Sequence, residues 1–208
     1  MLNQKGFNLW ANDYDKTVQV SEEKNEYPFA GYKKILNMIF NEVMKKPQSN
    51  VLDIGFGTGV LTGKLYENGH AIDGIDFSSE MIRHAQMKMP DANLMEWDFS
   101  KGLPDSLKQK KYDFIISTYA LHHLSDREKV GFIHNLLPLL SKTGKILIGD
   151  ISFKNRQQLE QCKSDNLSHW DHDEFYFAAD EITEALTPYG HCEYQSVSHC
   201  GGIFVITA

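Results

Sequence analysis

Short apolar runs alternate with longer amphipathic segments along most of this chain. The short runs have the length and composition of buried strands, and the longer segments repeat apolar residues at helical spacing. In residues 29–46, for example, Ile35, Ile39 and Val43 fall on one helix face, and Pro47 predicts the end of the helix. The predicted strands are 51–54, 71–76, 93–99, 112–118 and 144–150, and the predicted helices are 29–46, 60–68, 80–89, 127–140 and 180–189.

The alternation changes near the C-terminus. Residues 192–199 and 203–207 are two extended runs separated by Cys200-Gly201-Gly202, a pattern that predicts an antiparallel hairpin. We find no internal repeat and no linker that would indicate a second domain. The sequence therefore predicts a single α/β domain over residues 1–208, with helices on both faces of a largely parallel sheet.

A glycine-rich turn follows the first predicted strand. Gly55, Gly57 and Gly59 alternate with other residues, and glycine lets a backbone turn tightly and approach a ligand closely. A strand that ends in such a turn is typical of nucleotide-binding sheets. The dinucleotide fingerprint, however, requires its third glycine at the position of Val60.

The stretch 51–59, Val-Leu-Asp-Ile-Gly-Phe-Gly-Thr-Gly, is similar to the first motif of the class I S-adenosylmethionine-dependent methyltransferases. The resemblance covers nearly the whole chain and is closest to the YrrT-type bacterial methyltransferases, through residues 10–15, 117–120 and 122–124. It implies a Rossmann-like, seven-stranded sheet in the order 3-2-1-4-5-7-6 with strand 7 antiparallel, and S-adenosylmethionine as cofactor. It also implies that residues 1–28 cover the cofactor site. Phe56 departs from the small residue frequent at its position.

Asp76 is the predicted ribose ligand. It ends the second predicted strand 21 residues after Gly55, near the roughly 20-residue offset expected of a ribose-binding carboxylate. A carboxylate can accept hydrogen bonds from both ribose hydroxyls. Phe77 and Met81 follow it, and we expect them near the base.

The resemblance implies further cofactor contacts. Asp98 and Phe99 correspond to the adenine pocket, and the loop after the fourth strand lies beside the methionine moiety. Asp98 is equally suited to capping its own loop. The predicted cofactor-binding residues are Tyr14, Asp53, Gly55, Phe56, Gly57, Thr58, Gly59, Asp76, Phe77, Met81, Asp98, Phe99, Ser117 and Tyr119.

The charges of the ligand agree with this assignment. S-adenosylmethionine carries a sulfonium and an ammonium but no phosphate. Asp53, Asp76, Asp98 and Asp150 all lie at predicted strand ends or in the loops that follow, where several of them would repel a pyrophosphate. The net charge of -7 also opposes binding to a phosphate backbone, so we expect no nucleic-acid partner.

Composition and processing signals suggest a cytoplasmic enzyme. The 41% hydrophobic content is sufficient for a sizeable core. The three cysteines lack metal-ligand spacing and cannot all pair, which favours a reducing compartment. Residues 1–24 lack the apolar core of a secretory signal, and no run approaches the roughly 18 apolar residues of a membrane span. The oligomeric state stays open.

His123, His122 and Asp150 are the catalytic candidates. Methyl transfer from a sulfonium is an in-line displacement, for which alignment of the acceptor can suffice. A general base is needed only if the accepting atom must lose a proton. For the two histidines we favour the alternative role, in which they orient their loop through hydrogen bonds.

The segment His169-Trp170-Asp171-His172-Asp173 contains several metal-ligating side chains. We favour a different interpretation, in which residues 151–179 form a polar lid over the substrate and Phe175, Tyr176 and Phe177 pack it down. No metal cofactor is expected.

A small-molecule methyltransferase is the leading functional hypothesis. The chain lacks both the Asn/Asp-Pro-Pro-aromatic motif of DNA amino-methylating enzymes and the Pro-Cys nucleophile motif of C5 pyrimidine enzymes. The alternatives are a nucleotide-dependent oxidoreductase, which Val60 and the terminal hairpin disfavour, and a non-catalytic regulatory protein that binds the cofactor. Neither the acceptor nor the accepting atom follows from the sequence.

Overall fold

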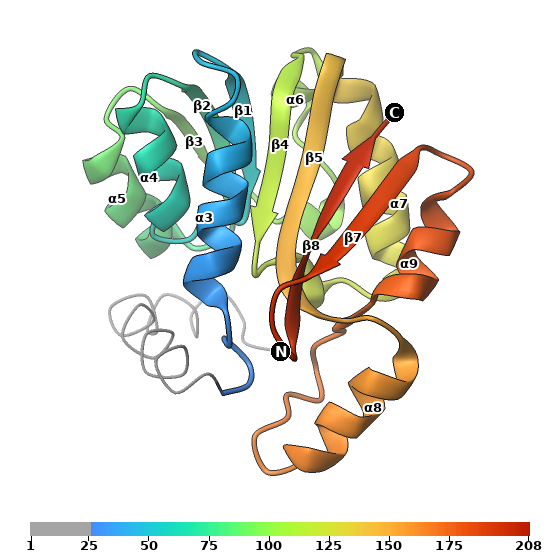
Figure 1. Cartoon of the computed structure of the whole chain (residues 1–208). Helices are drawn as coiled ribbons and strands as arrows, with labels where there is room; N and C mark the ends of the chain where they lie inside the picture. The colour runs from blue at the N-terminus through green and yellow to red at the C-terminus, as the bar shows by residue number, and fades with distance from the viewer. Residues whose placement is uncertain (1–25) are drawn as a thin grey trace.

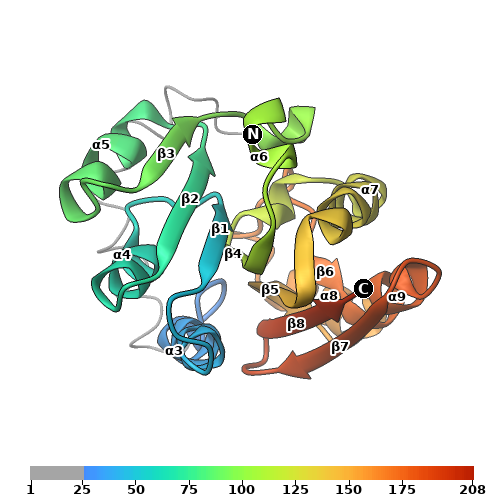
Figure 2. The ribbon, with the colours of Figure 1, turned by 90° about the horizontal axis from the view of Figure 1, so that it is seen from above.

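A computed structural model describes residues 26–208. Tyr14 and residues 1–25 of the predicted N-terminal segment 1–28 lie outside this described range. The described chain is a three-layered α/β arrangement, with a twisted central sheet between two groups of helices (Figures 1 and 2).

The sheet has the predicted strand order. It runs β3-β2-β1-β4-β5-β8-β7, with β1 to β5 parallel, β8 antiparallel to β5 and β7 antiparallel to β8. An eighth, two-residue strand that was not predicted, β6, pairs with the end of β5. The strands are β1 Asn50–Ile54, β2 Ala71–Asp76, β3 Asn93–Glu96, β4 Tyr112–Thr118, β5 Leu140–Phe153, β6 Phe177–Ala178, β7 His191–Ser196 and β8 Gly201–Thr207.

The sheet separates the core into two apolar layers, each covered by helices. Alternate residues of a strand face opposite layers, as in β1. Val51 belongs to the apolar cluster that includes residues of α3 and α4, and Leu52 belongs to the one that includes residues of α7 and α9. The α-helices are α3 Tyr32–Val43, α4 Val60–Glu67, α5 Ser79–Lys88, α6 Asp105–Lys108, α7 Asp126–Leu136, α8 Arg156–Asp165 and α9 Ala179–Leu186, and the 3-10 helices are η1 Phe99–Lys101, η2 Leu121–His123 and η3 Leu137–Leu139. No helix in residues 26–208 is both long and apolar enough to cross a bilayer.

Several predicted boundaries were wrong. The strand predicted over 144–150 spans Leu140–Phe153, and the strand predicted over 192–199 spans His191–Ser196. Two helix boundaries have a local cause. The helix predicted over 127–140 ends at Leu136, because Pro138 lies in the 3-10 helix η3 and the chain then enters β5 at Leu140. The helix predicted from residue 29 begins only at Tyr32, after Gly31 in the left-handed conformation (φ 79°).

Part of the predicted lid, residues 151–179, is regular structure. It contains α8, which begins at a cap formed by the Asn155 side chain and the Gln158 backbone NH (2.9 Å). Only Leu159 and Cys162 of this helix are buried, so its apolar periodicity is weak. The helix lies beyond the carboxyl edge of the parallel strands (Figure 1).

Candidate functional site

The glycine turn lies where β1 meets α4. Gly55, Gly57 and Gly59 all have left-handed φ values, of 71°, 56° and 72°. L-residues adopt this conformation at a cost, so the turn requires glycine for conformational reasons. A Cβ on Gly55 would also lie 2.5 Å from the Ala120 Cβ, whereas one on Gly57 would meet nothing within 4 Å.

Asp76 joins the end of β2 to this turn. Its carboxylate accepts hydrogen bonds from the backbone NH groups of Gly57 and Ser78, each at 2.9 Å. The side chain is buried, and burial raises its pKa to about 6 despite these hydrogen bonds. Asp76 therefore holds the glycine turn and directs a titratable carboxylate at the pocket beside it.

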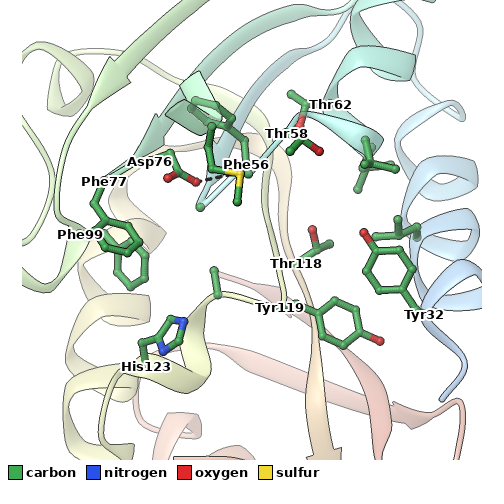
Figure 3. Close-up of a pocket in the computed structure, with 17 residues that line it drawn as sticks. Tyr32, Phe56, Thr58, Thr62, Asp76, Phe77, Phe99, Thr118, Tyr119 and His123 are labelled. Carbon is green, nitrogen blue, oxygen red and sulfur yellow. Dashed lines mark hydrogen bonds between the residues drawn. The ribbon is translucent and has the colours of Figure 1, made fainter. Parts of the chain in front are cut away.

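A cavity opens beside the glycine turn (Figure 3). Phe77 and Phe99 lie on the same side of it as Asp76, Tyr32 and Tyr119 lie on the opposite side, and His123 lies at one end. The predicted site residues that line it are Gly55, Phe56, Gly57, Thr58, Asp76, Phe77, Met81, Phe99, Tyr119 and His123. The structure thus brings residues from β1, β2, β4 and their loops to one cavity.

Tyr119 has an uncommon backbone conformation. Its φ of 52° lies in the left-handed region, which is rare for a residue with a large side chain, and such strain is concentrated at functional sites. Its NH donates to the Gly149 carbonyl (2.8 Å), and its ring lies 5.0 Å from that of Tyr32. These contacts hold the aromatic side of the cavity in place.

Four predicted cofactor ligands do not line the cavity. Asp53 is buried and accepts a hydrogen bond from the Thr62 hydroxyl, and burial raises its pKa to about 7. Ser117 donates to the Ile54 carbonyl (2.9 Å) and so links β4 to β1. Gly59 caps the start of α4. These three residues support the walls of the site.

Asp98, the fourth, caps η1. Its carboxylate accepts from the Ser100 backbone NH (3.0 Å) and from the Ser100 hydroxyl (2.6 Å). This geometry corresponds to the capping alternative that the sequence left open. The Asp98 carboxylate is also partly exposed. Contact between Asp98 and an adenine amino group stays a prediction.

Several cavity residues were not predicted. Tyr32 and Leu36 come from α3, which precedes β1 in the chain and carried no binding motif. Thr118 lies between the selected residues Ser117 and Tyr119 at the end of β4, and its position could have been found from them. Thr62 lies three residues after Gly59, in the first turn of the helix that follows the glycine turn. The lining residues that the sequence analysis missed are Tyr32, Leu36, Val60, Leu61, Thr62, Thr118 and Ala120.

The histidine pair lies on η2, directly after β4. The Asp150 carboxylate accepts from Nδ1 of His122 at 2.7 Å, and Oε1 of Glu174 lies 3.5 Å from Nε2 of the same ring. Burial would lower the pKa of His122, but the charge of Asp150 and its hydrogen bond raise it above the ordinary histidine value. Burial and the neighbouring His122 lower the pKa of His123 to about 3, which keeps that imidazole neutral.

The segment 169–173 forms part of an aromatic wall. Trp170 is buried and stacks on Tyr27, with ring centroids 5.2 Å apart, and packs against Tyr176 at 4.8 Å. His169 is exposed and lies within hydrogen-bonding distance of the Ser168 hydroxyl (2.9 Å). Neither histidine of this segment lines the cavity.

Comparison of the sequence with known proteins identifies relatives among the methyltransferases. Residues 51–144 match the model of a methyltransferase domain. An uncharacterized methyltransferase of Geobacillus sp. (strain WCH70) is 37% identical over 192 residues, which cover 88% of this chain and 87% of the relative. A second, from Geobacillus thermodenitrificans, is 34% identical over 88% of this chain and 86% of its own length.

Solved structures share the fold. A DhpI complex with S-adenosylhomocysteine superposes with a TM-score of 0.73 at 17% identity, covering 98% of this chain and 93% of that one. The magnesium protoporphyrin IX methyltransferase of Synechocystis PCC 6803 gives a TM-score of 0.67 at 20% identity, covering 86% and 85%.

The sequence comparison and the fold comparison indicate the same family. Relatives above 30% identity span most of both chains, and the strand order is that of the solved methyltransferases. The chain belongs to the class I S-adenosylmethionine-dependent methyltransferases.

Proposed function

We propose that this protein transfers the methyl group of S-adenosylmethionine to a small-molecule acceptor bound next to His123. The observation that carries the proposal is the single cavity in which the glycine turn, Asp76 and His123 meet. S-adenosylmethionine supplies a methyl group that is activated by its sulfonium. The residues of this chain bind it, align the acceptor and keep water away from the reacting atoms.

The cofactor end of the cavity fits an adenosyl group. Asp76 is placed to accept from ribose hydroxyls, and Phe77, Met81 and Phe99 provide apolar surface for the base. The open space over Gly57 allows close approach of the cofactor to the backbone. Two buried carboxylates, Asp53 and Asp76, lie near this end and favour a ligand with a net positive charge.

The acceptor end combines aromatic surface with one imidazole. Tyr32 and Tyr119 narrow the cavity on one side, and His123 lies at its end (Figure 3). Alignment of an acceptor in such a pocket can contribute on the order of 7–11 kcal/mol to lowering the barrier. Because the pKa of His123 is lowered to about 3, its imidazole is neutral at pH 7 but only weakly basic. We therefore assign it to orienting the acceptor through a hydrogen bond rather than to removing a proton.

A small acceptor is favoured over a macromolecule by charge and size. The net charge of -7 opposes nucleic acid, and residues 26–208 contain no inserted domain that would dock a protein. The chain of similar fold from Haloferax volcanii forms a complex with the Trm112 methyltransferase activator, so a macromolecular route is the competing hypothesis to test.

The test is a methyl-transfer assay with S-adenosylmethionine labelled in the methyl group. Purified protein is incubated with three fractions of a bacterial extract: small molecules, protein and RNA. We expect label in the small-molecule fraction only, and loss of that label with Asp76→Ala. Label confined to protein or RNA would refute the small-molecule proposal while leaving methyl transfer intact.

A further inference from the structure

His122, His123 and Glu174 form a cluster at the acceptor end of the cavity. One possible ligand atom from each side chain lies within 4.8 Å of the other two. Within the part of the chain that the structure describes, no other group of three or more His, Cys, Asp or Glu side chains meets this distance. The cluster differs from the segment 169–173, where the sequence placed its metal alternative.

The distances within the cluster suit a single small cation. Oε1 of Glu174 lies 3.5 Å from Nε2 of His122 and 3.9 Å from Nδ1 of His123. Bonds of about 2.0–2.2 Å to a tetrahedral zinc ion place neighbouring ligand atoms roughly 3.4 Å apart. Small side-chain rotations therefore bring all three atoms to bonding distance.

Asp150 orients the first of the two imidazoles. It accepts a hydrogen bond from Nδ1 of His122, so the proton lies on Nδ1 and the lone pair lies on Nε2, which faces Glu174. A carboxylate behind a ligating histidine is a usual outer-shell partner in metal sites, where it fixes the tautomer and the ring direction. Asp150 is fully buried, so water does not compete with His122 for this hydrogen bond.

The backbone holds Glu174 in place. The NH of Phe175 donates to the His122 carbonyl (2.7 Å), and the buried Lys129 donates to the Phe175 carbonyl. The Tyr176 hydroxyl donates to Oε2 of Glu174 (2.8 Å), which leaves Oε1 directed at the histidines. Lys129 is itself paired with Asp126 at 2.8 Å, which offsets its charge near the cluster.

We propose that His122, His123 and Glu174 bind one divalent transition-metal ion, with Zn²⁺ as the best match. Two imidazoles and one carboxylate are a donor set typical of such ions, and three protein ligands leave a position open. Because His123 lines the cavity, the open position faces it. An oxygen, nitrogen or sulfur atom of the acceptor coordinates there. That role for the acceptor rests on the proposed function, whereas metal binding itself does not.

The experiment is a calorimetric titration of metal-depleted, tag-free protein with ZnCl₂. We expect one Zn²⁺ per chain, and Co²⁺ absorption bands of a site with nitrogen and oxygen ligands. Glu174→Gln should weaken Zn²⁺ binding at least about 100-fold, beyond the roughly 10–100-fold cost of losing an outer-shell partner. The matched control is His191→Gln, which removes an exposed histidine that pairs with Glu193 on β7 and should change nothing.

Two further variants keep the test informative if Glu174→Gln does not fold. His123→Gln should also lose Zn²⁺, and Asp150→Asn, a change to a positioning residue, should weaken Zn²⁺ binding by about 10–100-fold. Affinity for S-adenosylmethionine, measured in the same samples, should stay unchanged in His191→Gln. The circular dichroism spectrum of Asp150→Asn should match that of the wild type, which a general loss of structure would not allow. Wild-type protein that binds no Zn²⁺, or variants that bind it normally, would overturn the metal site. Retained S-adenosylmethionine binding would then leave the proposed function standing.

Discussion

At the scale of single residues, Asp76 connects the glycine turn to the cavity. Its two oxygens already accept from Gly57 and Ser78, so the carboxylate holds the glycine turn in place before any ligand binds. Its position followed from the sequence because the strand, the turn and the acid lie within one short stretch. A hydrogen bond to a charged acceptor contributes more than a neutral one, so this residue is the first to test.

Asp76→Ala should weaken S-adenosylmethionine binding by about 1.5–3 kcal/mol, or roughly 10- to 150-fold, because hydrogen bonds to a charged acceptor are lost. Calorimetry of the purified variant measures this change. Asp105→Ala is the matched control, since it removes an exposed aspartate that only pairs with Lys108. Unchanged affinity in a folded Asp76→Ala protein would remove Asp76 from the ribose site.

The pH dependence of binding follows from the raised pKa of Asp76. With a pKa of about 6, the free protein carries a protonated Asp76 below pH 6 and a carboxylate above it. The carboxylate is the form that attracts the positively charged cofactor, so affinity should rise from pH 5 to pH 7. The slope should approach about tenfold per pH unit below the pKa. In Asp76→Asn this rise should be smaller, because only Asp53, with a pKa of about 7, remains of the two buried carboxylates near this end of the cavity. An equal rise in the variant would assign it to a group other than Asp76.

Other site residues could not be predicted because they depend on distant contacts. Glu174 lies about 50 residues after the histidines it approaches, and the hydrogen bond from the Phe175 NH to the His122 carbonyl holds it there. Tyr32 reaches the cavity because α3 covers the end of β4, a placement that amphipathic periodicity does not specify. Asp98, in contrast, had a local capping alternative, and the structure contains that cap.

At the scale of elements, the glycine turn allows two reasons for a glycine to be distinguished: the need for a left-handed backbone and the need for space beside a ligand. Gly57 and Gly69 both have left-handed φ values, of 56° and 82°, and a Cβ on either would meet nothing within 4 Å. The two positions therefore share a backbone cost, but only Gly57 lines the cavity. They form a matched pair.

Gly57→Ala and Gly69→Ala should each lower the free energy of unfolding by about 1–2 kcal/mol, the cost of the left-handed conformation for an L-residue. Only Gly57→Ala should also weaken S-adenosylmethionine binding, since its new methyl group occupies space at the cofactor. Urea unfolding and calorimetry measure the two effects. Equal cofactor affinity in both variants would mean that the ligand does not approach this turn.

The segment between β5 and α9 combines α8 with a buried aromatic wall. Trp170, Tyr176 and Tyr27 pack together, and the hydroxyls of the two tyrosines lie 2.6 Å apart. The sequence predicted a lid here but not α8, because eight of its ten side chains lie at least partly exposed and give little periodicity. Whether the segment moves over the substrate stays a prediction.

Trp170→Ala should lower the free energy of unfolding by about 3–5 kcal/mol, because it leaves a cavity within the aromatic wall. Phe175→Ala is the neighbouring control. Its ring is 45% exposed, so its loss should cost much less. Urea denaturation followed by circular dichroism gives both values. A loss below 1 kcal/mol for Trp170→Ala would show that the wall does not contribute to stability.

At the scale of the whole molecule, the strand order was the most predictable feature. Short apolar runs alternating with helices indicate a parallel sheet, and the terminal hairpin separates this topology from an all-parallel one. The predicted turn residues Gly201 and Gly202 are already part of β8, so the turn lies between Ser196 and Gly201. The two-residue strand β6 is too short to leave a pattern. The topology places the ends of β1, β2 and β4 together, and this placement creates the cavity.

The central claim is that this cavity binds S-adenosylmethionine, and parallel calorimetric titration tests it most directly. S-adenosylmethionine, S-adenosylhomocysteine and NADH are titrated into wild-type protein and into Asp76→Ala. The account predicts saturable one-to-one binding of both adenosyl ligands to the wild type, weakened in the variant, and no binding of NADH. Binding of NADH alone would contradict it and would make the glycine turn a divergent dinucleotide site.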